Sequence, residues 1–178
     1  KGEEPYIDPS NKMPESKFFP KGKLNYAENM LSGDINGLAL VFQSENKIRK
    51  EINWHELKSQ VATIANFLKK EGVLKGDRVA AYMPNMPETV IMMLATSSVG
   101  AVFASASPDF GVDGVLDRFG QIEPKILITT DGYWYNGKQI NITKKVEKVV
   151  EGLPSLKKVL ITPLLGIETN FKDTKFVN

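Results

Sequence analysis

The sequence predicts a doubly wound α/β fold, in which a mostly parallel β-sheet carries helices on both of its faces. The main observation is the nearly apolar stretch from Gly76 to Asp109, which alternates as a strand, continues as a helix and returns to a strand. A strand, a helix and a strand of this length imply two parallel, neighbouring strands. Two later apolar runs, at 125–129 and 158–162, each follow a predicted helix and repeat this order.

The chain before this stretch is predicted to hold an arm, a short helix and a hairpin. A proline-containing extended arm and an amphipathic helix at 24–31 form an amino-terminal region over residues 1–33. Residues 34–178 then form the first part of a larger α/β domain. Two strand-like runs at 38–43 and 48–52 are joined by a polar turn, which predicts a hairpin.

Two helix starts are predicted from capping patterns. Asn53 with Glu56 is typical of a capping box. The first side chain accepts a hydrogen bond from a free backbone N–H group of the helix, and the side chain three residues later accepts the backbone N–H of the first. Asn85 with Glu88 repeats this spacing at the start of the central helix, which we expect over 87–98. That helix is apolar on every face, so it should be buried on most sides.

The segment 89–108 contains no charged residue and is long enough for a membrane span. Gly100 and several hydroxyl side chains interrupt it, and a strand pattern follows at 101–105. We therefore expect a buried helix and a strand here, not a span.

The chain after the central stretch continues to alternate between helices and strands. The next helix should open at Asp109 or Gly111 and end before Pro124. The later elements are predicted as a strand at 125–129, an aromatic loop at 133–138, a basic helix near 142–151 and a strand at 158–162.

Composition excludes several functional classes. The chain has 178 residues and a net charge of +2, which argues neither for nor against nucleic acid, and no basic block stands out. We expect neither nucleic acid nor a membrane as a partner. It has no cysteine, which excludes disulfides, thiolate metal sites and cysteine nucleophiles and is compatible with the cytoplasmic location that we expect. The single histidine, His55, argues against a zinc site or a Ser-His-Asp triad.

Two loops at strand ends are candidates for ligand binding. The loop 105–111 should lie at the carboxyl edge of a parallel sheet, where such folds bind ligands, and the helix that follows it suits a phosphate or carboxylate. Its Asp109 could equally be a helix cap, and the sequence leaves both interpretations open. The loop 133–138 offers aromatic rings for an adenine or a pantetheine arm and Lys138 for a phosphate, although a solvated surface lysine is the alternative.

The sequence contains no recognisable catalytic centre. The phosphate-binding patterns G-x-G-x-x-G and G-x-x-x-x-G-K-[ST] are both missing. His55 is expected at the surface near a helix start, and Trp54 is expected as a core anchor. A phospho-receiver domain shares the fold type but needs clustered acidic side chains at strand ends, and only Asp131 occupies a clear strand end.

Four segments carry a resemblance to a known family: GKLNYAENML, INWHEL, KGDRVAAYMPNMPETVIMMLATSSVGAVFASASPDFG and DRFGQIEPKILITTDGYWYNGK. They resemble the adenylate-forming acyl-CoA synthetases over roughly residues 18 to 165. The start of the third segment is common to the superfamily, whereas DGYWYNGK is far more specific. The runs SASPDFGVDGVLDRFGQIEPK and DGYWYNGK look like the branch that activates acetoacetate, not the branch that activates acetate.

The resemblance implies an acid–thiol ligase that uses ATP, Mg²⁺ and CoA. In such enzymes ATP and the acid give an acyl-adenylate and pyrophosphate, and the CoA thiol then attacks the adenylate and releases AMP. The family's ATP-phosphate loop, adenylate motif and mobile carboxy-terminal domain with its catalytic lysine have no counterpart in this sequence. The resemblance therefore implies an amino-terminal fragment without catalytic residues and inactive alone, whose ATP and Mg²⁺ sites lie in the remainder of the same enzyme chain.

The resemblance also implies four CoA-binding residues. A glycine pair of the acetate branch aligns on Pro108 and Asp109, which do not reproduce the close backbone approach that glycines allow. An arginine pair near the CoA 3′-phosphate aligns on Tyr135 and Lys138; lysine keeps the charge without the bidentate fork, and tyrosine drops one charge. The alternative to a ligase fragment is a stand-alone CoA- or nucleotide-binding α/β module without catalysis, which would bind its ligand without any further chain.

Overall fold

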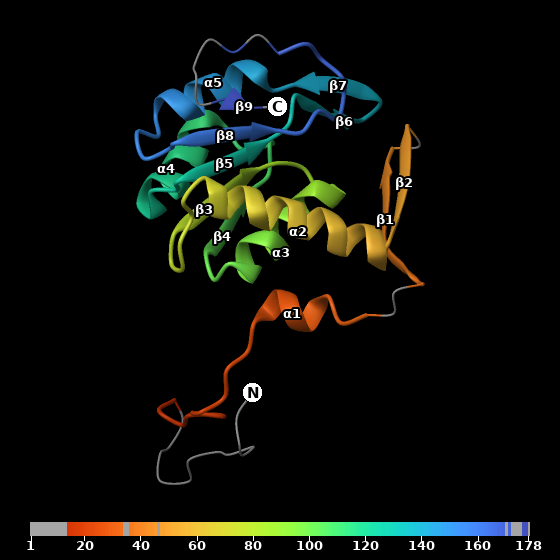
Figure 1. The fold of residues 1–178 in the computed structure, drawn as a ribbon. Helices are drawn as coiled ribbons and strands as arrows, with labels where there is room; N and C mark the ends of the chain where they lie inside the picture. Colours follow the sequence, from red (N-terminus) through yellow and green to blue (C-terminus); the bar gives the residue numbers. More distant parts are fainter. Residues whose placement is uncertain (1–13, 34–35, 46, 170, 172–175, 178) are drawn as a thin grey trace.

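A five-stranded parallel sheet forms the centre of the protein (Figure 1). The computed structural model describes residues 14–33, 36–45, 47–169, 171 and 176–177. The strands lie in the order β4-β3-β5-β8-β9, and each neighbouring pair is parallel. Their bounds are β3 Arg78–Tyr82, β4 Val102–Ala106, β5 Ile126–Thr129, β8 Lys158–Ile161 and β9 Phe176–Val177.

Helices cover both faces of this sheet, which confirms the predicted doubly wound fold. The helices are α2 (Trp54–Lys70) and α3 (Pro87–Ser98) on one face, and α4 (Val112–Ile122) and α5 (Thr143–Glu151) on the other. Successive side chains of a strand point to opposite faces. In β3, Val79 and Ala81 accordingly pack with α2 and α3, whereas Ala80 and Tyr82 pack with α4 and α5.

Two antiparallel hairpins stand outside the central sheet. The predicted first hairpin is present as β1 (Leu38–Ser44) and β2 (Ile48–Asn53). The second pairs β6 (Gly132–Tyr135) with β7 (Lys138–Asn141), so the prediction of an aromatic loop at 133–138 is wrong. Asn136 and Gly137 form its turn with φ angles of 48° and 72°, and positive φ at both central residues is what a tight two-residue hairpin turn requires.

The capping patterns were predictive for one helix and not for the other. At α2 the backbone N–H of Glu56 donates to Asn53 Oδ1 at 2.8 Å, as predicted. At α3 the predicted Asn85 cap is wrong, because Met86 occupies the cap position and makes no side-chain cap bond. Pro87, with its fixed φ, takes the first helical position, so the helix begins one residue too late for Asn85 to cap it.

The short helix α1 (Tyr26–Met30) lies beside α3 and is shorter than the predicted 24–31. Asn25 joins the two helices. Its Oδ1 accepts the backbone N–H of Glu28 at the start of α1, and its Nδ2 donates to the carbonyl of Ser97 at 3.1 Å near the end of α3. The predicted arm at 1–23 lies outside the described residues over its first 13 positions.

The charge-free segment 89–108 is divided between α3 and β4, as predicted. Six residues of α3 are buried, in keeping with its apolar composition: Pro87, Ile91, Met92, Leu94, Ala95 and Thr96. No helix within the described ranges has the length and apolar character needed to cross a membrane.

Candidate functional site

A cavity of about 260 Å³ lies at the carboxyl edge of the sheet, where the loops after β3 and β4 meet the β6–β7 hairpin. The chain passes from β3 outward to β4 and then back across β3 to β5, so the order of strands reverses at this edge. Open α/β sheets bind ligands at such a reversal. The cavity is lined by Met83, Pro84, Asn85, Thr89, Ser105, Ala106, Ser107, Pro108, Asp109, Tyr133 and Tyr135.

A buried tyrosine at the end of β3 fixes the loop after β4. The Tyr82 hydroxyl lies 2.8 Å from the carbonyl oxygen of Phe110 and 3.2 Å from that of Pro108, and its single proton is shared between them. Burial, with the negative charge of Asp109 nearby, raises the pKa of Tyr82 to about 12. Lys145 Nζ on α5 also donates to the Pro108 carbonyl, at 3.2 Å. The Pro108 carbonyl thereby accepts from side chains of two elements, β3 and α5.

Asp109 binds the second hairpin and does not cap α4. The N-cap of α4 is Gly111, which has no side chain to make a cap bond, so the helix-cap interpretation of Asp109 is wrong. Its carboxylate instead accepts the Tyr133 hydroxyl at 2.6 Å and the Ser107 hydroxyl at 2.9 Å. These two bonds hold the pKa of Asp109 below its ordinary value. Burial and the Asp109 carboxylate raise the pKa of Tyr133 to about 12.

Tyr135 and Lys138 are paired across the turn of the second hairpin. Tyr135 is 64% exposed and lines the cavity, and its Cα partner in the ladder is Lys138. Lys138 is also exposed but does not line the cavity. The structure therefore brings Pro108, Asp109 and Tyr135 to one cavity and places Lys138 beside it.

The sequence prediction does not include the part of the cavity wall near the end of β3, which consists of Met83, Pro84, Asn85 and Thr89. Asn85 is predicted only as a helix cap, and Thr89 donates to the Pro84 carbonyl at 2.8 Å. Tyr133 belongs to the predicted ligand-facing loop, but its bond to Asp109 is not predicted. The available signal was position, because the loop after β3 shares the carboxyl edge with the loop after β4.

Asp131, at the end of β5, is fully buried and engaged by the backbone. Its carboxylate accepts the N–H groups of Leu164 at 2.7 Å, Leu165 at 3.0 Å and Ile167 at 2.8 Å, and the Thr130 hydroxyl at 3.1 Å. Burial alone would raise the pKa of Asp131, but these donors outweigh burial and hold it below the ordinary value. An aspartate so engaged organises the segment after β8 and is not offered to a ligand.

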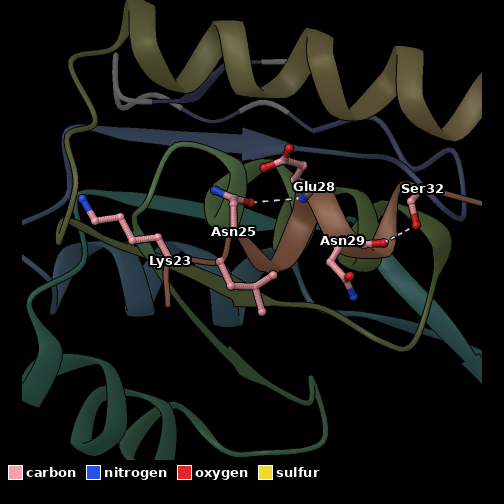
Figure 2. Close-up of a pocket in the computed structure, with 6 residues that line it drawn as sticks. Lys23, Asn25, Glu28, Asn29 and Ser32 are labelled. Carbon is pink, nitrogen blue, oxygen red and sulfur yellow. Dashed lines mark hydrogen bonds between the residues drawn. The ribbon is translucent and has the colours of Figure 1, made fainter. Parts of the chain in front are cut away.

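A larger concavity of about 700 Å³ lies at α1, away from this edge (Figure 2). Figure 2 shows Asn25 bonded to Glu28 and Ser32 bonded to Asn29, and both bonds stabilise the ends of α1. None of the four predicted CoA-binding residues lines it. We therefore place the candidate site at the sheet edge, where the smaller cavity and three of those residues coincide.

The remaining sequence candidates have structural roles. His55 is exposed on the first turn of α2. Trp54 is half-buried against the α2–α3 core, and its ring lies so close to Gly33 that a Cβ there would approach to 2.5 Å. Within the described part of the chain, no three His, Cys, Asp or Glu side chains converge in a way that could hold a metal ion.

The sequence profile described as AMP-binding enzyme matches residues 35–175, so the chain belongs to the AMP-binding enzyme family. Within that family it is similar to acetoacetyl-CoA synthetases. It is 48% identical to the acetoacetyl-coenzyme A synthetase of Rhizobium meliloti (strain 1021) over 93% of this chain, and 43% identical to the acetoacetyl-CoA synthetase of Macaca fascicularis over 91%.

A solved structure shows the same similarity. Acetoacetyl-CoA synthetase from Streptomyces lividans matches with a TM-score of 0.85 and 41% identity, covering 93% of this chain and 26% of that one. The chain spans about a quarter of the length of the curated relatives it matches, 25% for the Rhizobium protein and 24% for the Macaca protein.

Proposed function

We propose that the complete protein containing this chain is an ATP-dependent acid–CoA ligase whose acid is acetoacetate. The carboxylate of acetoacetate attacks the α-phosphorus of ATP and releases pyrophosphate, which leaves acetoacetyl-adenylate. The thiol of CoA then loses its proton and attacks the acyl carbon, and AMP departs with the electrons of the acyl–oxygen bond. The products are acetoacetyl-CoA, AMP and pyrophosphate.

The observation that carries this proposal is the 48% identity to an acetoacetyl-coenzyme A synthetase across 93% of this chain. The match leaves out only a small part of the chain. The structural similarity to the Streptomyces lividans synthetase, at a TM-score of 0.85, supports the same function.

Within that enzyme, we assign this chain to the amino-terminal part. We propose residues 1–33 as its amino-terminal arm and short helix, and 34–178 as the first part of its large α/β domain. Its partner is the remainder of the same enzyme chain, which we expect to hold ATP, Mg²⁺ and the catalytic lysine. We expect the complete protein to work in the cytoplasm, without a nucleic acid or membrane partner.

The contribution of this chain to the reaction is to bind CoA. Lys138 supplies a positive charge for the 3′-phosphate, and the exposed ring of Tyr135 offers an apolar face beside it. Pro108 and Asp109 form the neighbouring wall. The cavity of about 260 Å³ is smaller than most ligand pockets, which measure roughly 300–1,000 Å³, so it holds only a segment of CoA.

Calorimetric titration of this chain with CoA and with 3′-dephospho-CoA tests the site. We expect CoA to bind more tightly, and Lys138→Ala to reduce CoA affinity by about tenfold, the factor that corresponds to one lost charge-assisted contact. Affinity for 3′-dephospho-CoA should not change. Lys144→Ala removes the same charge from an exposed position on α5 and is the matched control.

A second assay tests the reaction. The complete protein should form acetoacetyl-CoA from acetoacetate, ATP and CoA with stoichiometric pyrophosphate, and failure to do so would refute the ligase assignment. The alternative to the ligase is a stand-alone CoA- or nucleotide-binding module without catalysis. It would be favoured if the isolated chain bound CoA while the complete protein formed no acyl-CoA.

A further inference from the structure

The tips of the two hairpins are joined by one carboxylate. Glu45 Oε1 accepts the backbone N–H of Asn136 at 2.6 Å, and its Oε2 accepts the N–H of Gly137 at 2.7 Å. These residues lie 91 and 92 positions apart in the chain. Figure 1 shows the tip of the β1–β2 hairpin reaching toward the β6–β7 hairpin, away from the central sheet.

The backbone of both tips is shaped for this contact. Asn136 and Gly137 have positive φ, so their consecutive N–H groups face the same oxygen pair. Consecutive turn amides of this kind form a small concavity that binds anions. Glu45 itself has a φ of 42°, a conformation that non-glycine residues adopt rarely. Glu45 thus adopts a strained backbone conformation while its two carboxylate oxygens accept two adjacent N–H groups. This combination indicates that the contact between the hairpins is specific.

A second contact joins the same two hairpins. Lys47 Nζ lies 5.3 Å from the centroid of the Trp134 ring, within the range of a cation–π interaction. Lys47 follows Glu45 in the β1–β2 turn, and Trp134 lies on β6 before the turn formed by Asn136 and Gly137. The β1–β2 tip therefore holds β6–β7 at two points.

We propose that Glu45 is a positioning residue for CoA. Its carboxylate holds the backbone N–H groups of Asn136 and Gly137, a contact called the clasp below, and thereby fixes Tyr135 at the cavity and Lys138 beside it. A two-stranded hairpin alone is marginally stable in water. The clasp therefore keeps the lysine charge and the tyrosine ring at a constant place relative to Pro108 and Asp109. This inference rests on the proposed function, because it assigns a purpose to the hairpin that would carry the CoA-binding pair.

The competing interpretation predicts the opposite effect of Glu45→Gln on CoA binding. The two turn amides could themselves belong to a phosphate site that Glu45 blocks, and removal of its carboxylate would then strengthen CoA binding. The two-point contact favours positioning, because Lys47 and Trp134 join the hairpins without occupying the turn amides. The direction of the effect of Glu45→Gln on CoA binding decides between them.

The test is steady-state kinetics of the complete protein with CoA and with 3′-dephospho-CoA. Glu45→Gln should raise KM for CoA by about tenfold, the factor expected when charge-assisted contacts that hold the site are lost. KM for ATP and the rate of acetoacetate-dependent pyrophosphate exchange should not change, because the first half-reaction does not use CoA. A general loss of folding would lower all of these together.

Glu51→Gln is the matched control. Glu51 lies on β2 of the same hairpin, carries the same charge and pairs with Arg49 on its own strand. Because both variants remove one negative charge from the same hairpin, the change in net charge is common to them. Only Glu45→Gln should reduce the preference for CoA over 3′-dephospho-CoA.

The double variant Glu45→Gln with Lys138→Ala isolates the positioning role. If Glu45 acts through Lys138, Glu45→Gln should have little further effect on CoA preference once the lysine is gone. An unchanged CoA preference in Glu45→Gln, a stronger one, or full additivity with Lys138→Ala would overturn the inference. If the wild-type protein forms no acetoacetyl-CoA, the proposed function fails instead. Amide exchange at Asn136 and Gly137 tests the clasp itself in either case, and equal protection in wild type and Glu45→Gln would refute it.

Discussion

Replacement of Asp131 by asparagine should destabilise the fold strongly, although it changes one oxygen to one nitrogen. The Asp131 carboxylate is fully buried and accepts three backbone N–H groups from the segment after β8. Asparagine keeps a single acceptor oxygen, which can serve Leu164 and Leu165. Its amide nitrogen would then face the N–H of Ile167, donor against donor.

The magnitude follows from the bonds that are lost. A hydrogen bond to a charged group contributes about 1.5–3 kcal/mol, and a donor left without a partner adds a desolvation cost of similar size. One such bond is removed outright and two are weakened, so we expect Asp131→Asn to lower the free energy of unfolding by about 3 kcal/mol. That is a large share of the roughly 5–15 kcal/mol by which domains are stable.

The cost should also depend on pH. The pKa of Asp131 is lowered in the folded chain, whereas an aspartate in an unfolded chain titrates near 3.9. The stabilisation by its carboxylate is therefore complete above about pH 4 and is lost as pH falls through the folded-state pKa. The stability difference between wild type and Asp131→Asn should be constant near pH 7 and should shrink as pH falls below about 4.

Urea unfolding followed by circular dichroism measures both effects on this chain. Asp117→Asn, at an exposed position on α4, is the control and should change the free energy of unfolding by less than about 0.5 kcal/mol. If Asp131→Asn were as stable as this control at pH 7, or if its deficit grew on acidification, the assigned role of the buried carboxylate would be refuted.

Two further stability predictions concern buried hydroxyl groups. Tyr82→Phe should lower the free energy of unfolding by about 1 kcal/mol in urea titrations, because it removes the donor that fixes the Pro108 and Phe110 carbonyls. The pKa of Tyr82 is about 12 in the folded chain, whereas an unfolded tyrosine ionises near 10. The wild type should therefore lose stability as pH rises from about 10 to 12, and Tyr82→Phe should lose less. Equal losses of stability in the two proteins would contradict this. Thr96→Val should add about 1 kcal/mol to the free energy of unfolding and so raise the melting temperature. The reason is that Thr96 Oγ1 is buried without a hydrogen-bond partner among the described residues. An unchanged or lower melting temperature would show that this hydroxyl is satisfied in solution.

The layers and the central strands could be predicted because their signals are local. Alternating or continuous apolar runs marked β3, β5 and β8, and Asn53 with Glu56 marked the start of α2. The second hairpin was missed although Asn136 and Gly137 are a strong hairpin signal. Its flanking strands are only four residues each, and the aromatic residues of the first, at 133–135, favour the interpretation as a ligand-facing loop.

Contacts between distant parts of the chain could not be predicted in this way. The backbone partners of Asp131 lie 33 to 36 residues later, and the contact between Glu45 and Asn136 spans 91 residues. No periodicity in the sequence couples such positions. The predicted Asn85 cap is wrong for a related reason. The sequence pattern is the same whether the first helical residue is one or two positions after the asparagine, and in the structure it is Pro87, two positions after.

The four residues that the resemblance aligns on glycine and arginine pairs of the acetate branch differ in how they are bound in this structure. The polar groups of Pro108 and Asp109 are already engaged: the Pro108 carbonyl by Tyr82 and Lys145, the Asp109 carboxylate by Tyr133. A ligand that used these groups would have to break those bonds. Tyr135 and Lys138 are exposed on the hairpin. We therefore expect CoA recognition by this chain to depend on the β6–β7 hairpin more than on the loop after β4, with that loop acting as a rigid wall.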